Sequence, residues 1–318
     1  MSRNKNMVTL ANQYVDYRRK LGFKLRVEAP LTLAFAEYAD REGHEGVITT
    51  ELALRWSRLP VNAAPLYHAR RLEIVRCFAK YAAIFDEETE IPPEGLLGTA
   101  HRRTQPHIYT DEEVNAVMNA AEELSPVGGL RPRTYVALFG ILASTGLRIS
   151  EALKLRRANV DLADGLLTIV KTKFHKSRFV PLHPSSTERL RAYERFRDRY
   201  CPVPTSDAFL LSEGGGDLKY PTVVHAFKTI RNGLGWKAVP GRRRPRLHDF
   251  RHTFACRRLL QWYRDGVDIE HAMTALSAYL GHDNVTSTYW YLTGIPELLE
   301  IAGEKFAKFA ARMKENSQ

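Results

Sequence analysis

The chain has 318 residues, of which 44% are hydrophobic and 26% are charged, and it carries a formal net charge of +11. These values are typical of a globular protein of about two domains, and they exclude a disordered or low-complexity chain. The sequence shows neither the ~20 apolar residues of a membrane span nor an apolar export signal, so we expect a cytoplasmic protein that does not enter a membrane. Three widely spaced cysteines indicate reduced thiols rather than a disulfide framework.

The positive surplus favours a polyanionic partner, because each phosphate that Lys or Arg neutralises releases counterions. A solvated basic surface is the alternative at this point. Residues 1–105 hold 16 basic and 13 acidic side chains, and the rest of the chain holds 31 and 23. The densest basic stretch is residues 241–258. A polyanion site is therefore expected in the second part of the chain.

The first part of the chain predicts a small helical domain. Apolar residues recur at three- and four-residue spacing in four segments, which are residues 8–20, 29–42, 50–59 and 63–84. The next twenty residues lose this period and gather Pro, Gly and an acidic block followed by a basic one. We therefore expect a helical domain over residues 1–90 and a linker over residues 91–108.

The pattern restarts at Tyr109 and predicts a second, α+β domain over residues 109–318, in a chain that is mainly α overall. Three short apolar or alternating runs, with an Asp164-Gly165 turn after the first, predict a small three-stranded antiparallel sheet. The strands are expected at residues 159–162, 166–171 and 178–182. Helices are expected at residues 110–124, 133–144, 150–155, 185–200, 221–234, 248–264, 269–280, 285–292 and 296–313.

The first segment that could carry chemistry is the helix break around Arg148. Gly146 interrupts an apolar helix, and Arg148 stands between it and the next helix start. A guanidinium at such a junction can present its planar fork of donors to a phosphate, with Glu151 close enough to orient it. The alternative is a plain ion pair between Arg148 and Glu151 on a helix surface.

The second segment is a basic turn between two predicted strands. Lys173, His175 and Lys176 would project from the tip of this hairpin. A lysine there is ordinarily solvated, but one that reached a phosphodiester could give its proton to a leaving alkoxide, which is general acid catalysis.

The third segment is the start of a predicted helix at His248. His248 and Arg251 lie three residues apart and so share one helix face, where an imidazole and a guanidinium could address one phosphate together. His248 and His252 also permit a metal site. That alternative lacks both the glutamate of a zinc-protease helix and an evident third ligand.

The fourth segment runs from Gly281 to Tyr291. Gly281 ends one helix, His282 follows it, and Tyr289 and Tyr291 lie further along. Aromatic residues in such a stretch ordinarily belong to a core. A tyrosine can nevertheless act as a nucleophile and form a covalent intermediate when cations stabilise its phenolate.

In this order, the motifs resemble those of the tyrosine recombinases, also called the phage integrase family. The resemblance covers most of residues 109–292, and the first domain is similar by position to that family's helical, SAM-like core-binding domain. It implies a site-specific DNA recombinase that cuts and rejoins strands through a 3′-phosphotyrosyl intermediate. The implied catalytic residues, with Glu151 in support, are Arg148, Lys173, His248, Arg251, His282 and Tyr291.

The resemblance also implies how the charged residues act. Arg148 and Arg251 would bind the scissile phosphate, His248 would assist proton transfer and His282 would support the phosphate. Because these groups and Lys173 offset the developing charge, the reaction would need neither a metal ion nor a nucleotide cofactor.

Spacing within the family's motifs selects the other two catalytic residues. Counting back from the family-like Val-Pro-Leu at residues 180–182 selects Lys173 as the general acid, although Thr172 and Phe174 stand where the family usually has glycines. Counting nine residues from His282 selects Tyr291 as the nucleophile over Tyr289. The residues expected to contact DNA are Lys171, His175, Lys176, Arg178, Arg242, Arg243 and Arg244.

The resemblance implies a double-stranded recombination site as the partner and a homo-tetramer on DNA. The apolar stripe of the last predicted helix would pack on a neighbouring subunit, with packing on its own domain as the alternative. Residues 173–186 resemble transposon-borne members, so we expect a role in DNA integration of a mobile element. A type IB topoisomerase-like relaxing enzyme and a non-catalytic DNA-binding regulator are the alternative functions.

Overall fold

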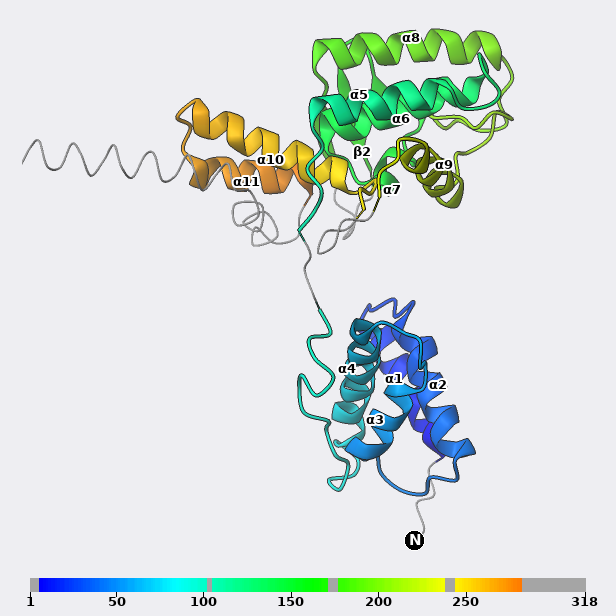
Figure 1. The fold of residues 1–318 in the computed structure, drawn as a ribbon, viewed down its shortest axis with the longest axis vertical. Coiled ribbons are helices and arrows are strands. Elements are labelled where there is room, and N and C mark those ends of the chain that lie inside the picture. Colours follow the sequence, from blue (N-terminus) through cyan, green and yellow to red (C-terminus); the bar gives the residue numbers. More distant parts are fainter. Residues whose placement is uncertain (1–5, 102–104, 171–176, 238–243, 282–318) are drawn as a thin grey trace, which may run out of the picture. The chain divides into compact units, whose positions relative to one another are not determined.

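The computed structural model describes residues 6–101, 105–170, 177–237 and 244–281 (Figure 1). The chain divides into two compact units, Met1–Arg103 and Thr104–Gln318. Each unit has a hydrophobic core of its own. The functional names given above to the first domain and the linker remain predictions.

The first unit is built from four helices: α1 (Met7–Lys20), α2 (Glu28–Arg41), α3 (Thr50–Arg58) and α4 (Pro65–Ala82). They bury an aromatic centre in which the ring of Phe35 lies 5.4 Å from Trp56 and 6.3 Å from Phe78. The predicted helices are confirmed to within one or two residues at each end. Helix α3 starts at Thr50 as predicted, and Thr49 just before it is the N-cap, with its hydroxyl accepting the N–H of Leu52.

The segment after α4 lies against the first unit without forming a helix. The N–H of Glu90 donates to the carbonyl of Ile48 at 2.9 Å, and Nε of Arg76 donates to the carbonyl of Pro92 at 2.9 Å. Arg76 also pairs with Glu94 at 2.8 Å. The proline- and glycine-rich stretch is therefore fastened to α4 over much of its length.

The second unit packs its helices around α6 (Leu130–Thr145), which contacts α5 (Asp111–Glu122), α8 (Pro184–Tyr200) and α10 (Asp249–Arg264). Buried aromatic rings, among them Phe139 stacked 6.1 Å from Phe250, fill the space between them. The remaining helices of the described part are α7 (Ile149–Ala152), η1 (Arg157–Asn159), α9 (Tyr220–Gly233) and α11 (Ile269–Leu280). The predicted helices at residues 285–292 and 296–313 lie outside the described residues.

The predicted three-stranded antiparallel sheet is present, in the order β1 (Val160–Asp161), β2 (Leu166–Ile169) and β3 (Arg178–Pro181). Leu167 pairs with Val180, and both are fully buried. Alternation along β3 leaves Phe179 66% exposed, so Arg178 shares the inward face with Val180. The hairpin that joins β2 to β3 contains residues 171–176, which lie outside the described part.

Helices α10 and α11 pack side by side and share a small apolar cluster around Leu259 and Leu276 (Figure 1). Helix α11 also contacts β3. This places the end of α11 close to the sheet and to the start of α10. Among the described residues, no helix has the length and hydropathy needed to cross a membrane, and the three cysteines are free thiols.

Candidate active site

The backbone around Arg148 is shaped by a close approach of two helices. Gly146 ends α6 in the left-handed conformation, with φ of 63°. A Cβ at this position would lie 2.6 Å from Cδ1 of Phe254 on α10. Glycine is therefore required both by the turn and by the neighbouring helix. The turn leaves Arg148 at the N-cap of α7.

Arg148 bonds to two other parts of the second unit. Its Nη1 donates to Oε1 of Glu151 at 3.0 Å, and its Nη2 donates to the carbonyl of Gly281 at 2.7 Å. The side chain remains 32% exposed. Both the ion pair and an accessible guanidinium surface are thus present, so the ion-pair alternative and a phosphate-binding role are compatible.

Arg251 joins the same place from the first turn of α10. Its guanidinium is buried, with Nη1 donating to the carbonyl of Gly146 at 2.9 Å and Nη2 to that of Leu280 at 2.7 Å. A buried guanidinium needs such acceptors because its charge cannot be left without partners. Arg148 and Arg251, far apart in sequence, therefore meet at consecutive carbonyls where α11 ends.

A buried carboxylate, Glu151, lies beside these arginines and also receives Arg178. Nη1 and Nη2 of Arg178 donate to the two oxygens of Glu151 at 3.1 and 2.8 Å, and its Nε donates to the carbonyl of Tyr279 at 2.7 Å. Burial acts to raise the pKa of Glu151, but the bonds and charge of Arg178, followed by those of Arg148, hold it below its usual range. Glu151 is therefore ionised at neutral pH.

Arg178 is the residue whose position differs most from the sequence prediction. The DNA contact expected of Arg178 stays a prediction, and in the structure its side chain turns inward, 13% exposed, onto Glu151 and α11. This inward orientation could have been found from the sequence, because the two-residue period of a strand places Arg178 on the same face as the buried Val180.

His248 stands at the N-cap of α10, one turn from Arg251, with its ring 4.8 Å from that of His252. Although His248 keeps an exposed surface, the surrounding protein and then the charge of Arg251 lower its pKa below the ordinary 6.5. The imidazole is therefore neutral at pH 7 and able to accept a proton. Within the described residues, no group of three potential metal ligands includes the two histidines.

The start of α10 is held by the segment that enters the second unit. The buried ring of Tyr109 stacks on Phe250 at 4.5 Å, and its hydroxyl donates to the carbonyl of Arg246 at 3.0 Å. The backbone N–H of Tyr109 donates to the hydroxyl of Thr253 at 2.9 Å. Arg246 in turn pairs with buried Asp249 at 2.8 Å. These contacts fix the turn of α10 that carries His248 and Arg251.

The structure thus brings together Arg148, Glu151, His248 and Arg251, and it leaves Arg244 exposed before α10. It also places the end of α11 immediately before His282. The other predicted site residues lie outside the described part of the chain, namely Lys171, Lys173, His175, Lys176, Arg242, Arg243, His282 and Tyr291.

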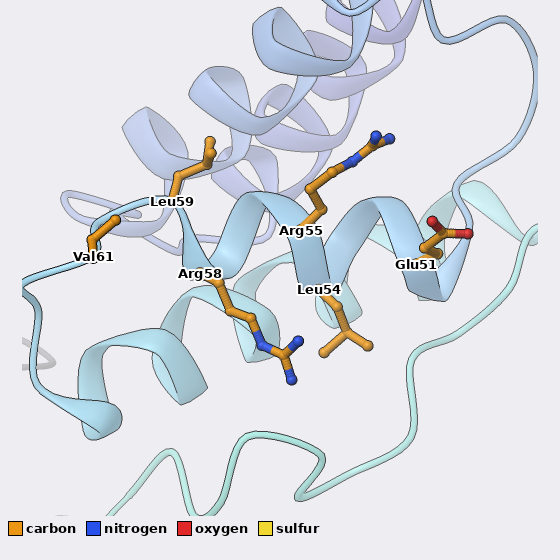
Figure 2. A pocket seen from close by; sticks show the side chains of 6 residues that line it. All are labelled: Glu51, Leu54, Arg55, Arg58, Leu59 and Val61. Carbon is orange, nitrogen blue, oxygen red and sulfur yellow. The ribbon is translucent and has the colours of Figure 1, made fainter.

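The first unit has a shallow hollow on α3 (Figure 2). All of its lining side chains project from α3 or from the residues just after it, and two of them, Arg55 and Arg58, are exposed cations. The others include Leu59 and Val61, which are exposed apolar side chains. This face combines positive charge with apolar surface.

Comparison with known proteins gives consistent matches over most of the chain. The model of the phage integrase family matches residues 108–294. The protein y4rB of Sinorhizobium fredii, which bears an integrase/recombinase name, is 40% identical over 294 residues, covering 91% of this chain and 93% of its own length. Tyrosine recombinase XerC of Chlamydia trachomatis is 31% identical over 224 residues, covering 70% of this chain and 65% of its own length.

Solved structures share the fold at low sequence identity. The Tn1549 transposon integrase in complex with transposon right end DNA has a TM-score of 0.69 at 13% identity, with coverage of 96% of this chain and 99% of that one. The XerH recombinase bound to palindromic difH substrate has a TM-score of 0.62 at 20% identity, with coverage of 88% and 79%. The helices and the small three-stranded sheet of this chain therefore have the fold of these two structures.

Proposed function

Because this chain belongs to the phage integrase family and is a site-specific DNA recombinase, we propose that its arginine cluster at the end of α11 binds the phosphate at which DNA strands are cut and rejoined. The observation that carries the proposal is the meeting of Arg148 and Arg251 at the carbonyls of Gly281 and Leu280. Two fixed cations at one place can offset the charge that develops on a phosphate during transfer.

In the proposed reaction, the hydroxyl oxygen of Tyr291 attacks phosphorus. A bond forms between Tyr291 and the 3′-phosphate while the bond from phosphorus to the 5′-oxygen breaks. Neutral His248 assists removal of the tyrosine proton, and Lys173 supplies the proton that the leaving 5′-oxygen takes up. A 5′-hydroxyl from a partner strand then reverses these steps. Each step exchanges one phosphoester bond for another, so the proposed reaction needs no nucleotide, and the cationic side chains offset the charge that a metal ion would otherwise stabilise.

A nicked duplex that carries the cognate site tests this proposal, because the short fragment released by cleavage cannot return. The wild-type chain should accumulate a covalent adduct, and Tyr291→Phe should form none. Tyr289→Phe is the matched control and should form the adduct. An adduct from Tyr291→Phe that is lost in Tyr289→Phe would show that Tyr289 is the nucleophile.

We further propose that the first unit contributes to DNA binding through the cations of α3. Arg55 and Arg58 both line the hollow on α3, together with Glu51 and the apolar side chains of Leu54, Leu59 and Val61 (Figure 2). Since each lost phosphate contact lowers the dependence of binding on salt by about one unit, the Arg55→Ala/Arg58→Ala variant should lower it by about two. An unchanged salt dependence would remove α3 from the interface.

The biological setting proposed is the movement of a mobile element in the cytoplasm. The support is the similarity to y4rB and to the Tn1549 transposon integrase. DNA flanking the gene should serve as a substrate for strand exchange between two duplexes. If a single duplex is relaxed without any exchange of partners, the topoisomerase alternative holds.

The assembly proposed on DNA is a homo-tetramer joined through residues 296–313, whose apolar stripe is expected to pack on a neighbouring subunit. Truncation before Pro296 should leave binding of a half-site intact and abolish the slowly migrating complex that holds two duplexes. Retention of that complex would favour packing of this segment on its own domain.

A further inference from the structure

Three guanidinium groups surround the end of α11, and each takes one of three consecutive carbonyls. Arg178 bonds to the carbonyl of Tyr279, Arg251 to that of Leu280 and Arg148 to that of Gly281, all at 2.7 Å. The last carbonyls of a helix have no partner within the helix and carry its negative pole, so cations stabilise them. Arg178 belongs to this set as fully as the two proposed phosphate ligands.

The carboxylate of Glu151 is saturated by the same residues. Oε1 accepts Nη1 of Arg148 at 3.0 Å and Nη1 of Arg178 at 3.1 Å. Oε2 accepts the backbone N–H of Arg148 at 3.0 Å and Nη2 of Arg178 at 2.8 Å. These four bonds fill the acceptor sites of a carboxylate. Without Arg178, two of them would be lost and the remaining negative charge would act on Arg148 alone.

Gly281 gives an independent indication that the place of Arg178 is fixed. Its φ is +66°, and a Cβ built there would lie 2.8 Å from Nη1 and 3.1 Å from Cζ of Arg178. The backbone that leads to His282 therefore lies directly against the guanidinium of Arg178. A side chain at residue 281 and the observed position of Arg178 are mutually exclusive.

From these contacts we propose that Arg178 is a positioning residue for strand cleavage: it shares the charge of Glu151, so that Arg148 keeps its orientation and positive charge for the phosphate, and it holds the end of α11 that leads to His282. Arg178 does this without contacting DNA. The inference rests on the proposed function. It gives Arg178 of β3 a role in the active site, whereas the sequence analysis expected this residue to contact DNA.

The test measures the rate of covalent adduct formation on the nicked duplex, together with DNA affinity. Since a displacement of about 1 Å can slow catalysis by about 10²-fold, Arg178→Gln should lower the adduct rate by about that factor while DNA affinity and its salt dependence stay unchanged. If Arg178 instead contacts DNA, affinity should fall and the salt dependence should drop by about one unit.

A double variant separates charge sharing from simple loss of structure. In Arg178→Gln/Glu151→Gln the unshared negative charge is gone, so the adduct rate should recover by about tenfold over Arg178→Gln, a non-additive effect expected of coupled neighbours. A double variant as slow as Arg178→Gln, or slower, overturns the proposal. The matched control is Arg156→Gln, which breaks an arginine pair with Asp207 and Asp217 elsewhere in this unit and should retain the wild-type rate.

A substitute variant and two parallel controls complete the test. If Arg178→Gln does not fold, Arg178→Lys replaces it, because a lysine keeps the charge but cannot make the bidentate pair and the bond to Tyr279 together. A wild-type rate from Arg178→Lys would then overturn the inference. Wild type and Tyr291→Phe are measured in the same assay. If wild type forms no adduct, the proposed function fails. If wild type forms the adduct and Arg178→Gln forms it at the same rate, only this inference fails.

Discussion

Two groups of arginines in the second unit are buried to a similar degree but differ in their balance of charge. Arg197 is fully buried on α8, where it pairs with Asp198 at 2.8 Å and lies 3.5 Å from Glu194. Arg157 also pairs with Asp198 at 2.9 Å, so two cations face two carboxylates. Three arginines lie together at the end of α11, where Glu151 pairs with two of them, Arg148 and Arg178.

The difference separates a structural cluster from one suited to bind an anion. Arg197 is paired within the protein with Asp198 and Glu194, and its Nη1 also donates to the carbonyl of Phe209 at 3.0 Å. At the end of α11, Glu151 accepts from Arg148 and Arg178, while Arg251 donates to the carbonyls of Gly146 and Leu280. A phosphate would complete the second cluster and has no place in the first.

Loss of stability gives the largest expected contrast between the clusters. Arg197→Ala empties a fully buried side-chain position and leaves the carbonyl of Phe209 without its donor, so it should lower the free energy of unfolding by about 3 kcal/mol. Arg148→Ala leaves Glu151 paired with Arg178, so the loss should stay near 1 kcal/mol. Urea unfolding of both variants measures this, and equal losses would remove the distinction.

A pair of glycines tests how tightly the second cluster is packed. Gly281→Ala introduces a Cβ that meets Arg178, in a left-handed backbone, and should slow adduct formation by about 10²-fold. Gly266→Ala imposes a similar backbone strain, at φ of +73°, with nothing within 4 Å of the new Cβ. Both should cost about 1–2 kcal/mol of stability, and only Gly281→Ala should lose cleavage. Equal rates would contradict the packing described.

The surplus charge should also be visible in the titration of His248. Burial lowers its pKa most, followed by the charge of Arg251 and, to a smaller extent, that of Arg148, so the imidazole of the folded chain should titrate below 6.5 by NMR, and Arg148→Ala should move it slightly back toward that value. The unfolded chain binds the proton more readily, so this group's contribution to stability is present above pH 6.5 and is lost as pH falls below it. His248→Gln should lack this part of the pH dependence. Titration above 6.5 would contradict the account.

The smallest effect is expected outside both clusters, in the basic stretch before α10. Arg244 is exposed, and Arg244→Ala should lower the salt dependence of DNA binding by about one unit without changing the rate of cleavage after binding. Arg264→Ala removes an equally exposed charge at the other end of α10 and should leave the salt dependence unchanged. A slower cleavage step in Arg244→Ala would place this residue in the active site.

Periodicity was sufficient to predict most of the helices and the sheet, but not the short 3-10 helix at Arg157–Asn159, which has too few residues to show a period. The exact helix ends depended on local contacts: Thr49, just before the predicted start of α3, caps this helix because its hydroxyl accepts the N–H of Leu52. α7 has only four residues and no period of its own, so its prediction depended on the glycine break before it.

Residue type and order in the sequence selected Arg148, Glu151 and Arg251, and the structure places them together, while their catalytic roles stay predictions. The partners of these arginines were not, because the carbonyls of Leu280 and Gly281 meet them only through the packing of α11 on α10 and β3. A carbonyl is present at every residue and leaves no mark in the sequence. The inward position of Arg178 was missed because a basic residue near a hairpin was taken as a surface charge. The two-residue period of its strand was not used.

The most direct test of the central claim measures DNA binding and adduct formation on one preparation of Arg148→Ala. If the cluster at the end of α11 binds the scissile phosphate, adduct formation should fall by about 10³-fold or more, while affinity for the site changes by no more than about threefold. If adduct formation persists, Arg148 is not needed for cleavage. If binding and cleavage fall by the same factor, Arg148 contributes to DNA binding and not to stabilising the scissile phosphate. Either result contradicts the central claim.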